Sequence, residues 1–257
     1  MLKTDRRLRD FSFALLMATG LLLSTAGHAQ SDRADDPIAI LYAERPPFNI
    51  AQPDGSVGGL VGTPAANALR AAGIAFTWEA LPTNRSLYEV QANHRRVCGL
   101  GWYLTPERAQ FARFSDPISQ DGPLVAVLGR SYTGPHPASF QALLSDGRPN
   151  FLLKAGALYS SGPTPLIDET RVRVRWTSAG WPDIVQDVAE QHYDGTLLLE
   201  EEARYYIDNG VYKPGDLTLL RFPELPRGEL RRLMCSKMVG EDTIHAINAA
   251  LKQHPPS

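Results

Sequence analysis

A guanidinium and a helix start come together in the segment Cys98–Pro117, which reads CGLGWYLTPERAQFARFSDP. The apolar residues 97–100 predict a buried strand. Thr105 and Pro106 are typical of the cap and first position of a helix, so Arg108 falls in the first turn beyond the strand end. A guanidinium beside the free N–H groups of a helix start can hold an anion such as a carboxylate. The strand end supplies further candidate contacts, namely Gly101, Trp102 and Tyr103.

Three further side chains are candidates for the same site because they follow a predicted strand or begin a predicted helix. Glu44 and Phe48 follow the first strand, and Arg85 opens a helix, where a cation is locally unfavourable. We expect charged ligand contacts from Glu44 and Arg85. Phe48, Trp102 and Tyr103 are expected to form an aromatic wall. Ordinary roles are the alternatives: a rim charge, a solvated helix residue, and core packing of the aromatic rings.

The first third of the chain alternates strands and helices. Apolar runs predict strands at 38–42, 75–81 and 97–101, and helices over 63–73, opened by a Thr-Pro pair, and over 85–92. This order predicts an α/β fold with a parallel sheet and right-handed crossovers. Ligands of such sheets bind at the edge where the strands end, which is where the candidate residues fall.

A second α/β pattern follows, and the chain then returns to complete the first. Gly129–Pro137 is loop-like and is a candidate crossover, and Leu217–Phe222 is a candidate return. The pattern predicts two lobes, each a sheet flanked by helices. The strands expected after the first sheet are 124–128, 151–154, 172–176, 196–199, 217–222 and 230–236. The helices expected there are 140–144, 181–191, 200–209 and 241–252.

The first residues indicate export. Residues 1–29 combine a basic start, an apolar core over Phe11–Leu23 and a small-residue cleavage site ending at Ala29. An uncleaved membrane anchor is the alternative. This segment carries four basic and two acidic side chains, so its removal changes the net charge from −2 to about −4. A mildly acidic chain without a basic run gives no support for nucleic-acid binding.

Cys98 and Cys235 are the two cysteines of the chain. An even count in an exported protein favours a disulfide, and two buried free thiols are the alternative. The histidines and cysteines lack the spacing of a metal site, and the glycines do not match a nucleotide-binding fingerprint. We therefore expect neither a metal nor a cofactor.

Several motifs in this chain occur in a characteristic order. In sequence they are ERPPF at Glu44–Phe48, GLVG at Gly59–Gly62, TPER at Thr105–Arg108, FSDP at Phe114–Pro117, HYDG at His192–Gly195, CSK at Cys235–Lys237 and NAAL at Asn248–Leu251. Taken together they resemble the family 3 extracellular solute-binding proteins, the polar amino-acid-binding type associated with ABC transporters. The resemblance covers essentially the whole chain after the export signal.

The resemblance implies a type II periplasmic-binding-protein (Venus-flytrap) fold. Lobe 1 would comprise 37–125 plus 223–257, and lobe 2 would comprise 130–220. It further implies a periplasmic, monomeric binding protein rather than an enzyme. Such a protein would capture a small carboxylate-bearing, amino-acid-like solute and deliver it to the membrane permease of an ABC-type system.

The resemblance also assigns roles to residues. Arg108 would hold the ligand α-carboxylate, and Tyr103 stands where the family often has a small hydroxyl residue. The second-lobe contact would come from the loop 156–160, in which Ala157 stands where the family usually has a hydroxyl residue and Ser160 is a candidate ligand contact. The acid that receives the ligand amine would map near Glu200 or Glu201.

Two alternatives use the same scaffold. One is a cyclohexadienyl-dehydratase-like enzyme, in which a cleft glutamate such as Glu44 or Glu200 acts as general acid. The other is a ligand-sensing module that signals through a separate membrane partner.

Overall fold

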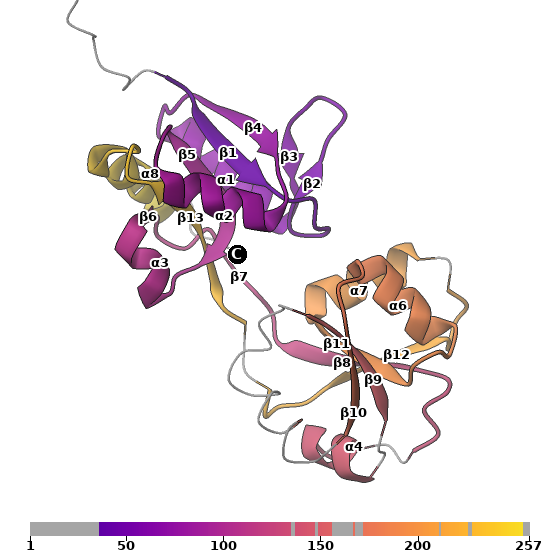
Figure 1. Ribbon diagram of the computed structural model, residues 1–257. Coiled ribbons are helices and arrows are strands. Elements are labelled where there is room, and N and C mark those ends of the chain that lie inside the picture. Colours follow the sequence, from indigo (N-terminus) through magenta and orange to yellow (C-terminus); the bar gives the residue numbers. More distant parts are fainter. Residues whose placement is uncertain are drawn as a thin grey trace, which may run out of the picture. The chain divides into compact units, whose positions relative to one another are not determined.

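The computed structural model in Figure 1 describes residues 36–134, 137–146, 149–155, 167, 172–210, 212–225 and 228–253. The predicted export signal and Ser160 lie outside these residues. Within the described part of the chain, no helix has both the length and the apolar character needed to cross a membrane.

The first sheet has the predicted parallel start. Strand β1 (Ile38–Tyr42) lies between β4 (Phe76–Ala80) and β5 (Val97–Tyr103) and is parallel to both. Helices α1 (Gly59–Ala71) and α2 (Thr83–Ala92) make the two connections. The β-α-β-α-β prediction is confirmed, and the three strands end at one edge because parallel strands share a direction.

The end of the chain returns to this sheet, giving the order β4-β1-β5-β13-β6 with β7 also paired to β13. The strand β13 is antiparallel to β5 and completes the sheet beside it. A small hairpin joins β2 (Ile50–Ala51) to β3 (Val57–Gly58). The other elements of this lobe are α3 (Pro106–Phe111), β6 (Ala112–Phe114), β7 (Ser119–Gln120), β13 (Leu230–Ser236) and α8 (Glu241–Gln253).

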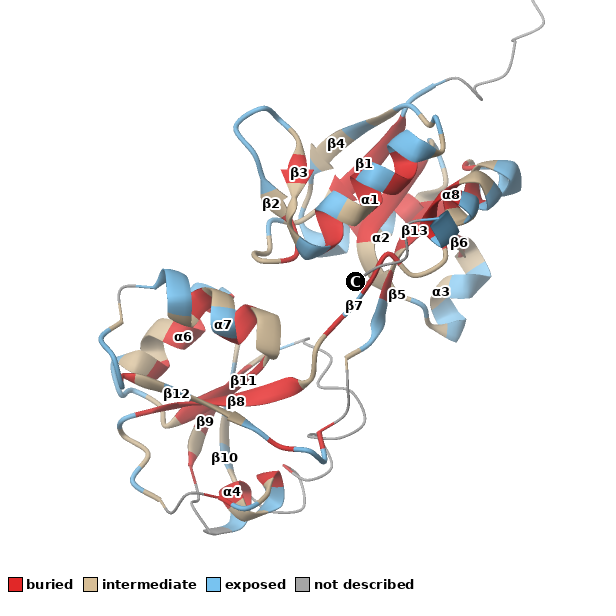
Figure 2. Ribbon diagram, turned by 180° about the vertical axis from the view of Figure 1, so that it is seen from behind, coloured by how far each residue is buried: buried red, intermediate tan, exposed pale blue. Residues whose placement is uncertain are grey.

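Helices cover both faces of the first sheet, and Figure 2 shows its central strands as buried. Helices α1 and α8 pack on one face, where Val61, Leu69 and Ile247 join one core cluster. On the other face Val90 of α2 packs with Met234 of β13 in a second cluster. Apolar packing on both faces holds the sheet between the helices. It therefore also holds in place the edge at which the parallel strands end.

The second sheet has the order β10-β9-β11-β8-β12. Its strand β8 is antiparallel to both neighbours, whereas β9 is parallel to β10 and β11. In Figure 1, α6 and α7 lie on one side of this sheet and α4 on the other. Its elements are β8 (Leu124–Gly129), α4 (Phe140–Asp146), β9 (Asn150–Lys154), β10 (Arg173–Thr177), α6 (Trp181–Ala189), β11 (Gly195–Leu199), α7 (Glu200–Asn209) and β12 (Leu217–Arg221).

The crossings between the sheets differ slightly from the prediction. The first crossing lies between β7 and β8, before Leu124, so Gly129–Pro137 is not the crossover. The candidate return, Leu217–Phe222, contains the predicted strand as Leu217–Arg221, but this strand belongs to the second sheet and is not the return. Phe222 and Leu225, which follow it, lie in the second core. The local apolar pattern of β8 fits either sheet, and its pairing with β11 and β12 decides its place.

Helix α1 begins four residues earlier than the Thr-Pro pair indicated. It starts at Gly59, and Pro64 lies inside it. The amides of Leu60 and Val61 donate to the carbonyls of Pro47 and Phe48, which satisfies the first free N–H groups of the helix. A tertiary contact therefore extends the helix beyond its local start signal.

The predicted disulfide is confirmed. Cys98 of β5 and Cys235 of β13 are directly opposite each other and form a disulfide across a sequence separation of 137 residues. Both residues are fully buried. The bridge joins the two segments of lobe 1 around the entire second lobe.

Candidate functional site

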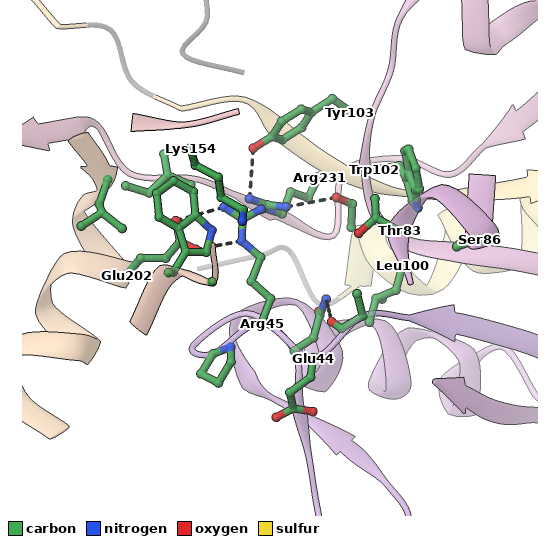
Figure 3. Close-up of a pocket in the computed structure, with 18 of the residues that line it drawn as sticks. Glu44, Arg45, Thr83, Ser86, Leu100, Trp102, Tyr103, Lys154, Glu202 and Arg231 are labelled. Atoms are coloured by element: carbon green, nitrogen blue, oxygen red, sulfur yellow. Dashed lines mark hydrogen bonds and ion pairs between the residues drawn. The ribbon is translucent and has the colours of Figure 1, made fainter. Parts of the chain in front are cut away.

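One cavity of about 920 Å³ is lined by residues of both sheets. Figure 3 shows part of its wall. The first lobe contributes the loop after β1, the start of α2 and the end of β5. The second lobe contributes the ends of β9 and β11, the start of α6 and one face of α7. The charged and aromatic lining residues are Glu44, Arg45, Trp102, Tyr103, Arg108, Lys154, Trp181, Glu202, Tyr206 and Arg231.

Arg108 lies on the cavity wall in the local structure that its sequence predicts. Thr105 caps α3 by accepting from the Arg108 amide, and Pro106 occupies the first turn. The Arg108 side chain donates from Nη1 to the Tyr103 carbonyl at 2.9 Å and lies 4.7 Å from the Trp102 ring centroid. Partial burial lowers the Arg108 pKa, but arginine remains charged at neutral pH. In the described part of the chain it makes no ion pair.

Gly101 and Trp102 shape the wall beneath Arg108. Gly101 has φ +74°, and a Cβ there would lie 3.2 Å from Val61 Cγ1. At Gly99 a Cβ would lie 2.4 Å from Trp102 Nε1, so glycine leaves room for the indole. Gly99 therefore leaves the space that the Trp102 ring occupies at the strand end.

Tyr103 belongs to a buried polar group with Arg231 and Asp121. The Tyr103 hydroxyl donates to Asp121 Oδ2 at 2.5 Å and accepts from Arg231 Nη2 at 3.0 Å. Arg231 binds both oxygens of Asp121, at 2.5 and 2.8 Å, and donates to the Gly101 carbonyl at 3.1 Å. Burial raises the Tyr103 pKa, so the hydroxyl remains a donor. Tyr103 is thus held in place on the wall by groups of its own lobe and of the crossing segments.

Arg45 and Glu202 form a bidentate ion pair across the cavity. Arg45 Nε lies 2.8 Å from Glu202 Oε1, and Nη2 lies 3.0 Å from Oε2. The Glu202 side chain is 1% exposed and that of Arg45 is 32% exposed. Burial opposes the charge on Arg45, but attraction to Glu202 outweighs it and raises the Arg45 pKa. The guanidinium also lies 5.3 Å from the Phe48 ring centroid and 5.8 Å from that of Trp181.

The three consecutive glutamates at the start of α7 have different partners. Glu200 accepts from Arg221 and Arg204, which lowers its pKa to about 2. Glu201 Oε1 accepts from the Gly122 amide at 2.6 Å, and burial raises its pKa. Only Glu202 of the three is on the cavity wall. The predicted acidic contact at Glu200 therefore has its carboxylate engaged elsewhere.

Of three other predicted contacts, Glu44 lines the cavity, whereas Phe48 and Arg85 are not among the lining residues. Phe48 is 2% exposed and packs in the first core, with the Arg231 guanidinium 4.4 Å from its ring centroid. Arg85 forms an i,i+4 ion pair with Glu89 at 2.8 Å on the surface of α2. Glu44 is on the cavity wall but exposed, and its Oε2 accepts from the Ala51 amide at 3.0 Å.

Sequence reasoning missed Arg45, Lys154, Trp181, Glu202 and Arg231. Arg45 carries the same strand-end signal as Glu44 beside it. Glu202 shares the buried face of α7 with Ala203 and Tyr206, a helical spacing that the sequence does contain. For Arg231 no local signal exists, because its partner Asp121 is 110 residues away.

A second group of polar side chains lies at the end of α6. Potential metal-ligand atoms of Asp187, Glu190 and His192 all lie within 4.8 Å of one another. His192 Nδ1 is 3.2 Å from Asp187 Oδ1, and the His192 side chain is 59% exposed. The three residues are exposed or half-buried and do not line the cavity, so we assign them no metal.

No protein-family model matches the chain, and none of the curated proteins matches it. Among solved structures, the substrate-binding protein of an amino acid ABC transporter is 17% identical, with a TM-score of 0.61 over 85% of this chain and 93% of that chain. This chain has the same two-lobed α/β fold. An ancestral arginine-binding protein bound to arginine is 17% identical, with a TM-score of 0.63 over 84% of this chain and 91% of that one.

The holo form of ArgBP from T. maritima is 18% identical, with a TM-score of 0.61 over 86% of this chain and 91% of that chain. Structural similarity at such low sequence identity establishes the fold but not the ligand. The predicted fold class, a two-lobed periplasmic-binding-protein fold, is confirmed.

Proposed function

We propose that this chain is a periplasmic solute-binding protein that captures a small carboxylate-bearing solute between its lobes. The observation that carries the proposal is Arg108, a cation on the wall of a cavity lined by both lobes, with no ion-pair partner among the described residues. A guanidinium with remaining donors is suited to a carboxylate. Export through cleavage near Ala29, a monomeric state and delivery to an ABC-type permease belong to the same proposal.

The similar solved structures support this role. They are the substrate-binding protein of an amino acid ABC transporter, an ancestral arginine-binding protein and ArgBP from T. maritima. Their lobes and those of this chain share one architecture, in which binding between lobes is coupled to hinge closure. The cavity lies where strands of both sheets end, so a ligand bound there would contact both lobes and favour the closed form. In this proposal the permease recognises that closed form.

The cavity gives less support to the dehydratase-like alternative. A general acid must be protonated at the working pH. Of the two candidate acids, Glu200 is not among the residues that line the cavity, and Arg221 and Arg204 lower its pKa to about 2. The Glu200 carboxylate is therefore suited to pairing with cations rather than to donating a proton, and Glu44 is the acid of this alternative that lines the cavity.

Calorimetry on purified residues 30–257 tests the proposal. The panel comprises L-amino acids, their deaminated counterparts, small dicarboxylates and prephenate. We expect saturable binding of at least one carboxylate and no turnover of prephenate. Absence of binding by the whole panel would overturn the proposed function, and prephenate turnover would replace it with the enzymatic alternative.

A further inference from the structure

Most of the charged side chains described on the cavity wall have a partner within the protein. Among the described lining residues, the cations are Arg45, Lys154, Arg108 and Arg231, and the acids are Glu44 and Glu202. Arg231 is neutralised by Asp121, which lies behind the wall and is 3% exposed. Arg45 is neutralised by Glu202, so Arg108 is left as a cation of the wall with no ion-pair partner among the described residues. A cation of this kind in a cavity with apolar walls favours a ligand group of opposite charge and disfavours a positive group close to it.

The buried acid on the wall is already occupied. Both oxygens of Glu202 accept from Arg45, at 2.8 and 3.0 Å, and Figure 3 shows the two side chains joined in this way. A ligand ammonium could reach Glu202 only by displacing the guanidinium. Displacement would leave Arg45 without its carboxylate among aromatic rings of Phe48 and Trp181, and an unpaired charge in such surroundings is costly.

The other acid among the described lining residues is poorly placed to receive an ammonium group. Glu44 is exposed at the rim, and one of its oxygens is bonded to the Ala51 amide. In Figure 3 its carboxylate points away from the guanidinium groups of Arg45 and Arg231. An ammonium there would remain hydrated and screened, and exposed ion pairs contribute little.

On the basis of the solute-binding function proposed above, we infer that the cavity selects small carboxylic acids that lack an ammonium group. The Arg108 guanidinium receives the carboxylate, and the Arg45–Glu202 pair excludes amino acids. Trp102, Trp181 and the leucines of β11 provide apolar surface for the body of the acid. Specificity of this kind rests on a repulsive element as well as an attractive one.

Calorimetry with matched ligand pairs tests this inference on residues 30–257. The pairs are glutarate with L-glutamate, 3-phenylpropionate with L-phenylalanine and 4-methylpentanoate with L-leucine, and L-arginine is added alone. We expect the deaminated member of at least one pair to bind more tightly, by about tenfold or more, and arginine not to bind. An amino acid that binds as tightly as its deaminated counterpart overturns the inference but leaves the solute-binding function standing. No binding by any compound overturns both.

The variant Arg45→Gln tests the mechanism of exclusion. Removing the guanidinium frees Glu202, so the preference within a pair should shift toward the amino acid by about tenfold. Arg204→Gln is the matched control, since Arg204 lies on α7 and pairs with Glu200 outside the cavity. An unchanged preference in folded Arg45→Gln rejects the role of this pair. If that variant does not fold, the wild-type ligand pairs decide the inference alone.

Discussion

At the scale of single residues, the proposed carboxylate binding depends on Arg108. Replacing Arg108 by alanine removes a charge-assisted contact, and we expect ligand affinity to fall by about 1.4 kcal/mol or more, a factor of about ten. Arg108→Lys keeps the charge but loses the planar contact with Trp102, so its loss should be intermediate. Calorimetry with the tightest carboxylate of the panel measures both effects.

Arg70→Ala provides the control for this prediction. Arg70 is exposed on α1, in the same lobe but away from the cavity. Its removal should leave affinity within experimental error. Equal affinity of wild type and Arg108→Ala, with normal melting of both, would remove Arg108 from the site.

Glu200 predicts a pH dependence of stability. Its pKa in the folded protein is about 2, below the ordinary value of 4.5, because Arg221 and Arg204 donate to it. The ion pairs therefore stabilise the fold above about pH 4.5, and this stabilisation is lost as pH falls toward 2. At neutral pH, Glu200→Gln should lower the free energy of unfolding by about 1 kcal/mol, because the half-exposed arginines are screened.

Denaturant unfolding from about pH 7 to about pH 3 measures the difference between wild type and Glu200→Gln. That difference should shrink below about pH 4.5. Asp208→Asn is the control, since Asp208 is exposed on the same helix and has no ion pair among the described residues. A difference that stays constant with pH would contradict the assignment of these ion pairs.

The candidate site could be predicted from the sequence only where its signals are local. Trp102, Tyr103 and Arg108 were found because a strand end and a capped helix lie within a few residues of each other. Glu202 was missed in favour of Glu200, because neighbouring glutamates have the same local signal and differ only in the face of α7 that they occupy. Arg231 depends on Asp121, a partner that only the folded chain brings near.

At the scale of elements, the sequence predicted the strand and helix order well because hydrophobic periodicity and caps are local properties. Helix α7 has the predicted bounds, Glu200–Asn209, and β13 has the predicted bounds, Leu230–Ser236. The start of α1 was wrong because carbonyls of Pro47 and Phe48 accept its first amides. Assignment of β8 to the second sheet likewise depends on long-range pairing.

The disulfide between β5 and β13 should contribute to stability through the long loop that it closes. A bridge across 137 residues restricts the unfolded chain, and we expect its loss to cost about 2–4 kcal/mol. Cys98→Ala, Cys235→Ala and the double variant each remove the same bridge. Their losses, measured by denaturant unfolding, should therefore be similar. Single losses that add up in the double variant would show that the side chains contribute separately.

At the scale of the whole molecule, the two passages of the chain between the sheets are held together. Strand β7 pairs with the start of β13, and the Asp121 amide donates to the Glu229 carbonyl at 3.0 Å. The Asp121–Arg231 ion pair joins the same two segments, with both side chains at least nine-tenths buried. Tyr103 connects this pair to the cavity wall. A substitution at Asp121 or Arg231 should therefore lower the stability of the whole molecule rather than that of one lobe.

A double-mutant cycle on Asp121 and Arg231 tests this role. Asp121→Asn leaves a buried guanidinium without its carboxylate, so the free energy of unfolding should fall by about 3 kcal/mol or more. Arg231→Met should cost a similar amount, whereas the double variant should lose less than the sum, because no unpaired charge remains. Arg130→Met, which breaks an ion pair to Asp216 with Arg130 55% exposed, is the control and should cost about 1 kcal/mol or less. Strictly additive losses at Asp121 and Arg231 would mean that the two crossing segments are held by their backbone pairing alone.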